Sequence, residues 1–285
     1  MDPIRIAYVR YLNTRPLVEG LSVAAGAELI PAAPSHIADL VRSGKADVGL
    51  ASIIDAAGPG EPLAVVPAGM IGCDGPTMTV RLYSATPLER IEQVHTDTES
   101  HSSVALCRVL LDRLHDRRPA FVDFDARERM SAAGPEEWPP AMLLIGDKVV
   151  TDSPPAVRYP YQLDLGEAWK MLTGLPFVYA AWVCRARDAD TARIAAAGAL
   201  LDRQLRHNLT RLDWIVEMRA PEHRWPADLA REYVGRLLRF QVGPREREAA
   251  ERFVAEAARL GLVPGRRLAW ADWKAPLAAG AAGRE

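Results

Sequence analysis

The sequence predicts an α/β protein built from two lobes, with a ligand cleft between them. Short apolar segments alternate with amphipathic helical patterns in two separate series, as in parallel βαβ units. Two longer β-rich runs, 77–84 and 177–185, join the two series. The chain has 285 residues, 49% of them hydrophobic, which is more than one average domain and ample for a core.

The first series begins with a strand at 4–9 and a short helix at 16–25. A second strand at 27–31 precedes a helix for which Ser35 is a candidate N-cap and 43–44 the end. A third strand is predicted at 47–51.

The second series contains predicted strands at 94–96, 120–124 and 141–145, with helices at 102–114 and near Arg127. The helix at 102–114 places its apolar residues on one stripe, as a helix packed on a sheet requires. After the run 177–185, the remainder to residue 260 has the apolar spacing of helices.

This order predicts a discontinuous architecture. We expect lobe 1 to comprise residues 1–83 and 183–285, including the C-terminal helices, and lobe 2 to comprise residues 84–182. A ligand in such a protein lies in the cleft, at the carboxyl ends of strands and the amino ends of helices.

Charge and apolar patterning exclude several classes of protein. The 35 basic and 37 acidic residues give a net charge of −2, so neither nucleic acid nor an acidic membrane is expected as a partner. The longest apolar stretch, 175–184, is about half the length of a membrane span. Residues 1–8 lead directly into a strand without the pattern of a signal peptide, so we expect a cytoplasmic protein.

Cofactor motifs are missing from the sequence. It contains no glycine-rich phosphate loop, no H-E-x-x-H, no G-x-S-x-G, and no cysteine or histidine pairs at metal-ligand spacing. The three cysteines are far apart and are interpreted as reduced, partly buried thiols. We therefore expect neither a metal nor another cofactor.

Polar residues gather where predicted strands end. Tyr11 and Asn13 follow the first strand, and Asn13 either caps the next helix or presents its carboxamide to a polar ligand. Ser52 follows the third strand with the same two alternatives. Asp147 follows the strand at 141–145 and either caps a turn or faces the ligand.

A serine-rich turn precedes the predicted helix at 102–114. Ser100, Ser102 and Ser103 combine hydroxyls with free backbone N–H groups and the positive end of the helix dipole, which favours an anion. One of them is the N-cap, and the sequence leaves open which one. His101 is either a surface residue or a group for proton transfer. Other candidates for substrate contact, where the chain passes between the lobes, are Ser84, Thr173, Gly174 and Phe177.

Five segments together resemble the chorismate dehydratases of the futalosine route to menaquinone. They occur in the family's order within the first 185 residues: 11–17, 47–52, 100–106, 145–147 and 169–182. The resemblance implies the type II periplasmic-binding-protein-like fold, used as a cytoplasmic enzyme. The sequence departs from the family where Asp55 replaces a frequent Glu, and where Ser-His-Ser-Ser replaces Ser-x-Thr-Ser.

The resemblance also implies a reaction and a site. Chorismate is the expected substrate, and it loses water to give 3-[(1-carboxyvinyl)oxy]benzoate without a cofactor. The protein is expected to be a monomer or a homodimer. Asn13 is the expected catalytic residue, with Ser52 and the turn at 100–103 binding carboxylates. The base is His101, Asp147 or a carboxylate of the substrate itself.

Two alternatives share this fold. A non-catalytic binding protein for a small carboxylate would need export, for which the sequence has no signal. The 1,4-dihydroxy-6-naphthoate synthase of the same pathway usually opens with Ser-Pro-Cys-Pro-Asn-Asp after the first strand, a motif not found here.

Overall fold

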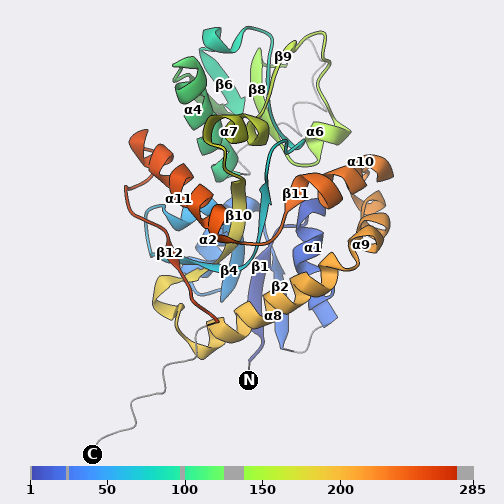
Figure 1. The fold of residues 1–285 in the computed structure, drawn as a ribbon, viewed down its shortest axis with the longest axis vertical. Helices are drawn as coiled ribbons and strands as arrows, with labels where there is room; N and C mark the ends of the chain where they lie inside the picture. Colours follow the sequence, from blue (N-terminus) through green and yellow to red (C-terminus); the bar gives the residue numbers. More distant parts are fainter. Residues whose placement is uncertain (1, 24–25, 97–99, 125–137, 275–285) are drawn as a thin grey trace, which may run out of the picture.

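The protein folds around two β-sheets that lie one above the other (Figure 1). The computed structural model describes residues 2–23, 26–96, 100–124 and 138–274. The two sheets confirm the predicted α/β class. The helix expected near Arg127 lies outside the described residues.

The lower, seven-stranded sheet takes strands from both ends of the chain. Its order is β11-β4-β10-β3-β1-β2, and β12 pairs with the edge of β4. β1 is parallel to β2 and β3, whereas β10 is antiparallel to β3 and β4. The strands are β1 (Ile4–Tyr8), β2 (Ala27–Pro31), β3 (Val48–Ser52), β4 (Leu63–Cys73), β10 (Phe177–Arg185), β11 (Leu238–Arg239) and β12 (Ala269–Trp270).

The upper, five-stranded sheet is formed by one continuous stretch of chain. Its order is β7-β6-β8-β5-β9, with β6 parallel to β7 and β8, and β5 antiparallel to β8 and β9. The strands are β5 (Val80–Ser84), β6 (Gln93–Thr96), β7 (Ala120–Asp123), β8 (Ala141–Ile145) and β9 (Tyr161–Asp164).

Strand pairing places the crossings between the sheets earlier than residues 84 and 182. All of β5 pairs within the upper sheet and β10 pairs within the lower sheet, so the chain crosses at 74–79 and at 165–176. We call residues 2–73 and 177–274 lobe 1, and residues 80–164 lobe 2. The segments between them are the first crossing segment (74–79) and the second crossing segment (165–176).

Helices cover both faces of the lower sheet because its strands alternate their apolar side chains. Ile6 and Leu50 face one cluster with α1 and α8, whereas their neighbours Ala7 and Ala51 face the other with α2, α3 and α11. The helices are α1 (Arg15–Val18), α2 (Pro34–Arg42), α3 (Ile53–Ala56), α4 (His101–His115), α6 (Lys148–Thr151), α7 (Leu165–Thr173), α8 (Ala192–Leu209), α9 (Leu212–Arg219), α10 (Ala227–Glu232) and α11 (Pro244–Arg259).

Several local features differ from the sequence-based prediction. The helix expected at 16–25 ends at Val18, because Gly20 adopts a positive φ of 84°, and a short 3-10 turn follows at Leu21–Val23. Strand β9 was not predicted.

β4 was not predicted, because Pro67 and Gly69 interrupt its apolar run. The structure places both in an irregular stretch of β4, where the partners of β10 step from Met70 to Val66. Helix α2 begins at Pro34 and not after Ser35, because proline suits the first helical turn.

The two crossing segments are joined by the carboxylate of Asp164. It accepts hydrogen bonds from the backbone N–H groups of Thr77 (2.9 Å) and Met78 (2.8 Å) in the first crossing segment. It also caps α7 by accepting from the N–H groups of Gly166 and Glu167. A Cβ at Gly166 would lie 2.1 Å from Thr77 Oγ1, so only glycine permits this close approach.

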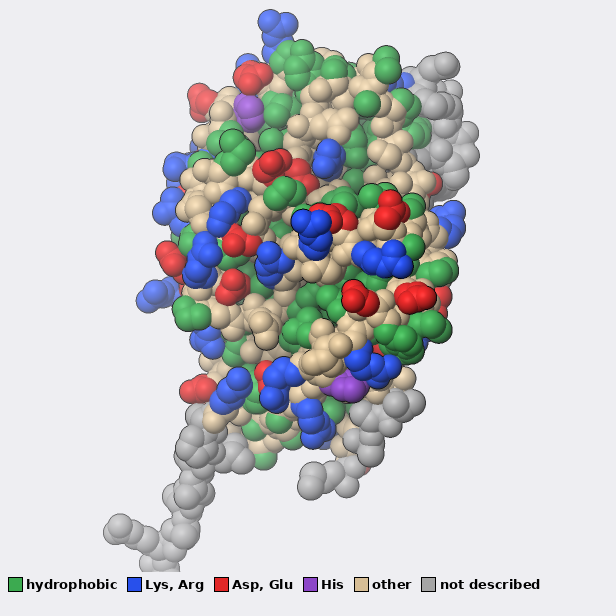
Figure 2. All heavy atoms as spheres, turned by 45° about the vertical axis from the view of Figure 1, so that its right-hand side comes forward, with side chains coloured by type: hydrophobic (Ala, Val, Ile, Leu, Met, Phe, Trp, Pro, Cys, Tyr) green, Lys and Arg blue, Asp and Glu red, His purple; other side chains and the backbone are tan. Residues whose placement is uncertain are grey.

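Charges of both signs are mixed over the face of the molecule seen in Figure 2. Figure 2 shows Lys and Arg side chains interspersed with Asp and Glu over the face in view, without a large area of one sign. Among the described residues, no helix combines the length and apolar character needed to cross a membrane.

Candidate functional site

A pocket between the two lobes collects the ends of strands from both sheets. Its walls come from the segment after β1, the ends of β3 and β8, the first crossing segment, the start of α4, β10 and the C-terminal helices. The polar side chains that line it are Tyr11, Asn13, Ser52, Thr77, Thr79, Ser100, Ser103, Tyr179 and Tyr233.

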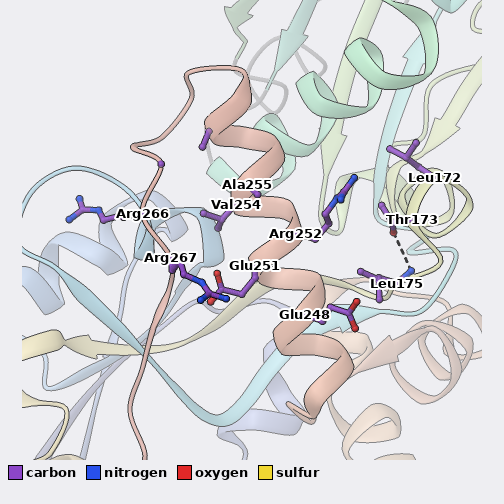
Figure 3. A pocket seen from close by; sticks show the side chains of 12 residues that line it. Leu172, Thr173, Leu175, Glu248, Glu251, Arg252, Val254, Ala255, Arg266 and Arg267 are labelled. Atoms are coloured by element: carbon purple, nitrogen blue, oxygen red, sulfur yellow. Dashed lines mark hydrogen bonds between the residues drawn. The ribbon is translucent and has the colours of Figure 1, made fainter.

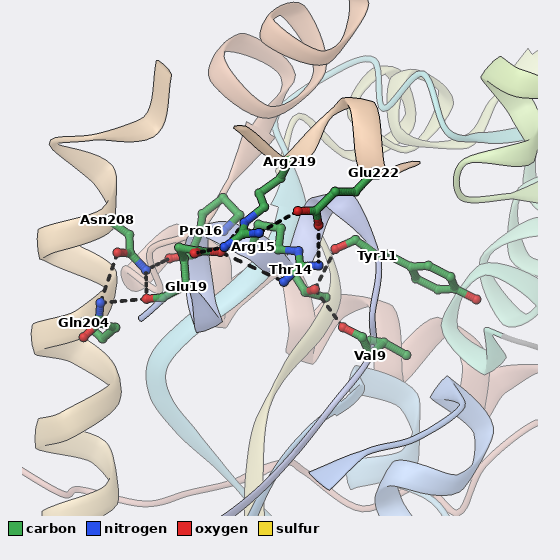
Figure 4. Close-up of polar contacts among 10 residues, drawn as sticks. All are labelled: Val9, Tyr11, Thr14, Arg15, Pro16, Glu19, Gln204, Asn208, Arg219 and Glu222. Atoms are coloured by element: carbon green, nitrogen blue, oxygen red, sulfur yellow. Dashed lines mark hydrogen bonds and ion pairs between the residues drawn. The ribbon is translucent and has the colours of Figure 1, made fainter. Parts of the chain in front are cut away.

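The loop that carries Asn13 is fixed from within. Thr14 is fully buried, and its hydroxyl contacts the carbonyl oxygens of Val9 and Tyr11, each at 2.7 Å. These contacts close the turn after β1 (Figure 4). Asn13 lies within this turn and lines the pocket.

Helix α1, which follows Asn13, is tied to the C-terminal helices by ion pairs and amide contacts. Arg15 pairs with Glu222 at 3.2 Å, and Arg219 pairs with both Glu222 and Glu19 (Figure 4). Asn208 of α8 donates to the carbonyl oxygen of Pro16 at 3.1 Å. The Asn13 loop is therefore held by residues about 200 positions away.

The carboxamide of Asn13 is oriented by one hydrogen bond. Its Nδ2 donates to the hydroxyl of Tyr233 at 3.1 Å. Its Oδ1 is buried and has no partner in the part of the chain that the structure describes. A buried acceptor without a partner is costly, so this oxygen is suited to a donor on a ligand.

The three hydroxyls of the serine turn make different contacts. Ser100 is the N-cap of α4 and accepts from Ser103 N, and the two hydroxyls lie 3.0 Å apart at the pocket wall. Ser102 accepts from the backbone N–H of Ile54 and is not among the lining residues. The structure thus identifies the cap that the sequence left open.

Ser52 lies at the junction of β3 and α3, in lobe 1. It occupies the N-cap position of α3, but its side chain makes no capping hydrogen bond. The side chain is 6% exposed and lines the pocket. Its hydroxyl is thus positioned for a ligand.

Four lining hydroxyls were missed by sequence reasoning: Thr77, Thr79, Tyr179 and Tyr233. Thr77 contacts Tyr179 at 2.7 Å, and Thr79 donates to Tyr233 at 2.8 Å. Burial raises the pKa of both tyrosines, so both remain protonated at neutral pH. The two threonines sit in a run interpreted as a strand, and Tyr233 was interpreted only as an apolar helix residue.

The pocket presents neutral donors and acceptors. None of its described lining residues is Asp, Glu, Lys, Arg or His. Several hydroxyls and the amino end of the 15-residue helix α4 converge on it. Such a site suits an anion with several oxygens, held by hydrogen bonds and a helix dipole.

His101 lies outside this pocket lining. Its Nδ1 is 2.8 Å from Asp55 Oδ1, and the hydrogen bond joins α4 of lobe 2 to α3 of lobe 1. That hydrogen bond is the main cause of a raised pKa at His101.

Asp147 also lies beside the lining and not in it. Its Oδ2 is 3.3 Å from Nδ1 of His223, in the turn Pro221–His223 of lobe 1. The neighbouring residue Gly146 does line the pocket. Asp147 and His101 therefore each take part in a contact between the lobes.

Four other candidates are placed away from the pocket. Ser84 is fully buried and its hydroxyl contacts Thr86. Phe177 is 1% exposed and packs edge-on against Trp169 and Phe253. The structure therefore gives Ser84 and Phe177 supporting positions within the two lobes.

Thr173 and Gly174 lie at the end of α7. Thr173 lines a separate groove between α7 and α11, in which its hydroxyl accepts from Leu175 N (Figure 3). Gly174 ends α7 at a φ of 73°, a conformation that glycine adopts without strain.

No metal cluster is found within the described ranges. No group of three or more His, Cys, Asp or Glu residues there could hold a metal ion. The cysteines Cys73, Cys107 and Cys184 are all buried as free thiols, and burial raises the pKa of Cys73 to about 11.

The fold and the pocket define a class: a two-lobed, binding-protein-like α/β protein with a polar pocket between the lobes. Protein AF1704 from Archaeoglobus fulgidus has the same fold, with a TM-score of 0.72 over 92% of this chain and 98% of that chain, at 14% identity. The periplasmic aliphatic sulphonate binding protein SsuA from Escherichia coli has a TM-score of 0.59 over 94% and 95%, also at 14% identity. These neighbours confirm the predicted periplasmic-binding-protein-like fold.

Residues 4–259 match the model of a protein family described as menaquinone biosynthesis. The chain belongs to this family. It is also 27% identical to the chorismate dehydratase of Thermus thermophilus over 239 residues, which cover 77% of this chain and 83% of that protein. The family expected from five short segments is thus confirmed.

Proposed function

We propose that this protein is a chorismate dehydratase, a hydro-lyase that converts chorismate to 3-[(1-carboxyvinyl)oxy]benzoate and water. The family assignment and the Thermus thermophilus relative support this activity. The structural observation that carries the proposal is the pocket between the lobes, with its converging hydroxyls and with Asn13 Oδ1, which has no partner within the described ranges.

The pocket chemistry fits a substrate with two carboxylates. Ser100 and Ser103, at the amino end of α4, are proposed to bind one carboxylate, and Ser52 of lobe 1 to bind the second. Neutral donors hold an anion by hydrogen bonds without forming an ion pair. Each hydrogen bond is stronger where the pocket wall excludes water, because the local dielectric constant is lower. The reaction needs this fixed orientation more than it needs a strong charge.

Asn13 is proposed to act at the reacting part of the ring. Its Oδ1 accepts from the ring hydroxyl that leaves, which fixes the conformation in which the neighbouring C–H bond is broken. Loss of that proton and of the hydroxyl makes the ring aromatic, which drives the reaction.

The proton acceptor is proposed to be a carboxylate of the substrate. His101 and Asp147, the two protein candidates, each pair with a residue of the other lobe and lie outside the described pocket lining. A substrate carboxylate held beside the ring can take the proton as the C–H bond breaks. It then passes this proton to the departing hydroxyl, so that the C–O bond breaks with release of water and the carboxylate is regenerated.

The direct test is to incubate the purified protein with chorismate and no added cofactor, and to follow the products by mass spectrometry. We expect a product lighter than chorismate by one water, with the ultraviolet spectrum of a substituted benzoate. Binding of chorismate without any loss of water would instead favour a binding protein of the same fold.

A further inference from the structure

Tyr233 occupies a central place in the pocket although it comes from the far end of the chain. It is the first residue of a π-helical turn, Tyr233–Leu237, that directly follows α10. π-Helical turns are rare and are found frequently at functional sites. Tyr233 is 1% exposed, and its ring stacks on Trp225 with centroids 4.9 Å apart and planes 10° apart. Its hydroxyl group is therefore rigidly placed.

The hydroxyl of Tyr233 accepts two hydrogen bonds and still holds its own proton. Asn13 Nδ2 donates to it at 3.1 Å, and Thr79 Oγ1 donates to it at 2.8 Å. Two donors occupy the acceptor positions of a phenol oxygen. The O–H proton has no acceptor in the described part of the chain, and Tyr233 lines the pocket.

Asn13 provides the complementary group. Because its Nδ2 is engaged by Tyr233, its Oδ1 is the atom left without a partner among the residues that the structure describes. The two side chains thus present one acceptor, Asn13 Oδ1, and one donor, the Tyr233 O–H, side by side in the pocket.

We propose that Tyr233 is a positioning residue of the substrate site, which fixes the Asn13 carboxamide with Oδ1 toward the substrate and donates its own proton to a substrate oxygen. The pair recognises a hydroxyl group adjacent to an ether or carboxylate oxygen, which is the arrangement on a hydroxylated cyclic acid. This inference rests on the proposed function for the identity of the substrate, but not for the geometry of the pair.

The test compares Tyr233→Phe with Tyr159→Phe. Tyr159 is a matched control, because it is also fully buried and its hydroxyl donates to Pro139 O at 2.9 Å in lobe 2, away from the pocket. We expect Tyr233→Phe to lower kcat/KM for chorismate about 10- to 100-fold, with most of the loss in kcat. Tyr159→Phe should keep both kcat and KM within about threefold of wild type.

A double variant separates positioning from a general loss of structure. If Tyr233 acts partly through Asn13, Tyr233→Phe should cause a loss of kcat/KM at least about threefold smaller in the Asn13→Ala background than in wild type. The loss that remains in that background measures the direct contact of Tyr233 with the substrate. Multiplicative losses would overturn the coupling, and a Tyr233→Phe protein with wild-type kcat/KM would overturn the proposal.

Calorimetric titration with chorismate distinguishes this inference from the proposed function. If the wild-type protein binds chorismate without turnover and Tyr233→Phe weakens binding at least about tenfold, the dehydratase activity is wrong and the role of Tyr233 stands. If the wild-type protein turns over chorismate and Tyr233→Phe changes neither binding nor kcat, the activity stands and the role of Tyr233 is wrong.

Discussion

At the scale of single residues, the site is a set of neutral side chains held by buried polar contacts. Asn13, Ser52, Ser100 and Ser103 could be proposed from the sequence because each follows a short predicted strand. Tyr233 could not, because 220 positions separate it from Asn13, to which it is hydrogen-bonded. Only the return of the C-terminal helices to lobe 1 brings the two together.

Asn13→Ala tests the proposed catalytic residue. We expect kcat to fall about 100-fold or more, because one oriented polar group at a reacting centre is worth that much in other enzymes. The chain should still fold, because the loop is held by Thr14 and the contacts of α1. Steady-state kinetics and a thermal melt measure the two effects, and wild-type turnover would remove Asn13 from the mechanism.

The serine turn offers an internally controlled pair of variants. Ser103→Ala removes a hydroxyl that lines the pocket, so we expect KM to rise about tenfold. Ser102→Ala removes the acceptor of Ile54 N, so it should cost about 1 kcal/mol in the free energy of unfolding and leave KM unchanged. A reversal of these two results would mean that the anion is bound elsewhere.

At the scale of elements, the two crossing segments connect the lobes, and the first of them also supplies Thr77 and Thr79 to the pocket lining. The sequence predicted that the chain crosses twice, because two long β-rich runs separate the two series. The predicted boundaries at 83–84 and 182–183 fall within β5 and β10, whereas the whole of β5 pairs in the upper sheet and the whole of β10 in the lower sheet. Strand partners are long-range information that local patterns do not contain.

Asp164→Ala tests the contact between the crossing segments. Four backbone N–H groups lose their acceptor, two in each segment, so we expect the free energy of unfolding to fall by about 3 kcal/mol. Urea unfolding measures the loss. Asp39→Ala is the control: its side chain is 75% exposed in an ion pair with Arg42, and its effect should be below about 0.5 kcal/mol.

At the scale of the whole molecule, two histidine–aspartate contacts link the lobes on different sides of the pocket. Lobe 2 contributes the histidine of one contact, His101 with Asp55, and the aspartate of the other, Asp147 with His223. His101 and Asp147 were predicted as site residues because each follows a predicted strand. Residues that contact the neighbouring lobe can occupy the same position after a strand.

The His101 contact should make stability depend on pH. Its pKa is raised by Asp55, so its contribution is complete below the usual histidine value of about 6.5 and is lost as pH rises through the higher folded value. We expect the difference in melting temperature between wild type and His101→Gln to be largest near pH 6 and to shrink toward pH 9. The effect should stay below about 1 kcal/mol, because the His101 side chain is 46% exposed.

Asp55→Asn provides the matching variant from the other lobe. It should remove the same pH-dependent part of the stability, and the two variants combined should lose no more than either alone. A difference that grows between pH 6 and pH 9 would contradict the role given to this contact.

The discontinuity of lobe 1 has a consequence for the order in which the protein forms during synthesis. All strands of the upper sheet have been made once the ribosome has passed residue 164, whereas the lower sheet still lacks β10, β11 and β12. β4 is therefore synthesised early, whereas the strands that pair with it are up to about 200 residues further along the chain. Because domains generally fold as units during synthesis, lobe 2 can be complete while lobe 1 is still half built, and the pocket between them forms last.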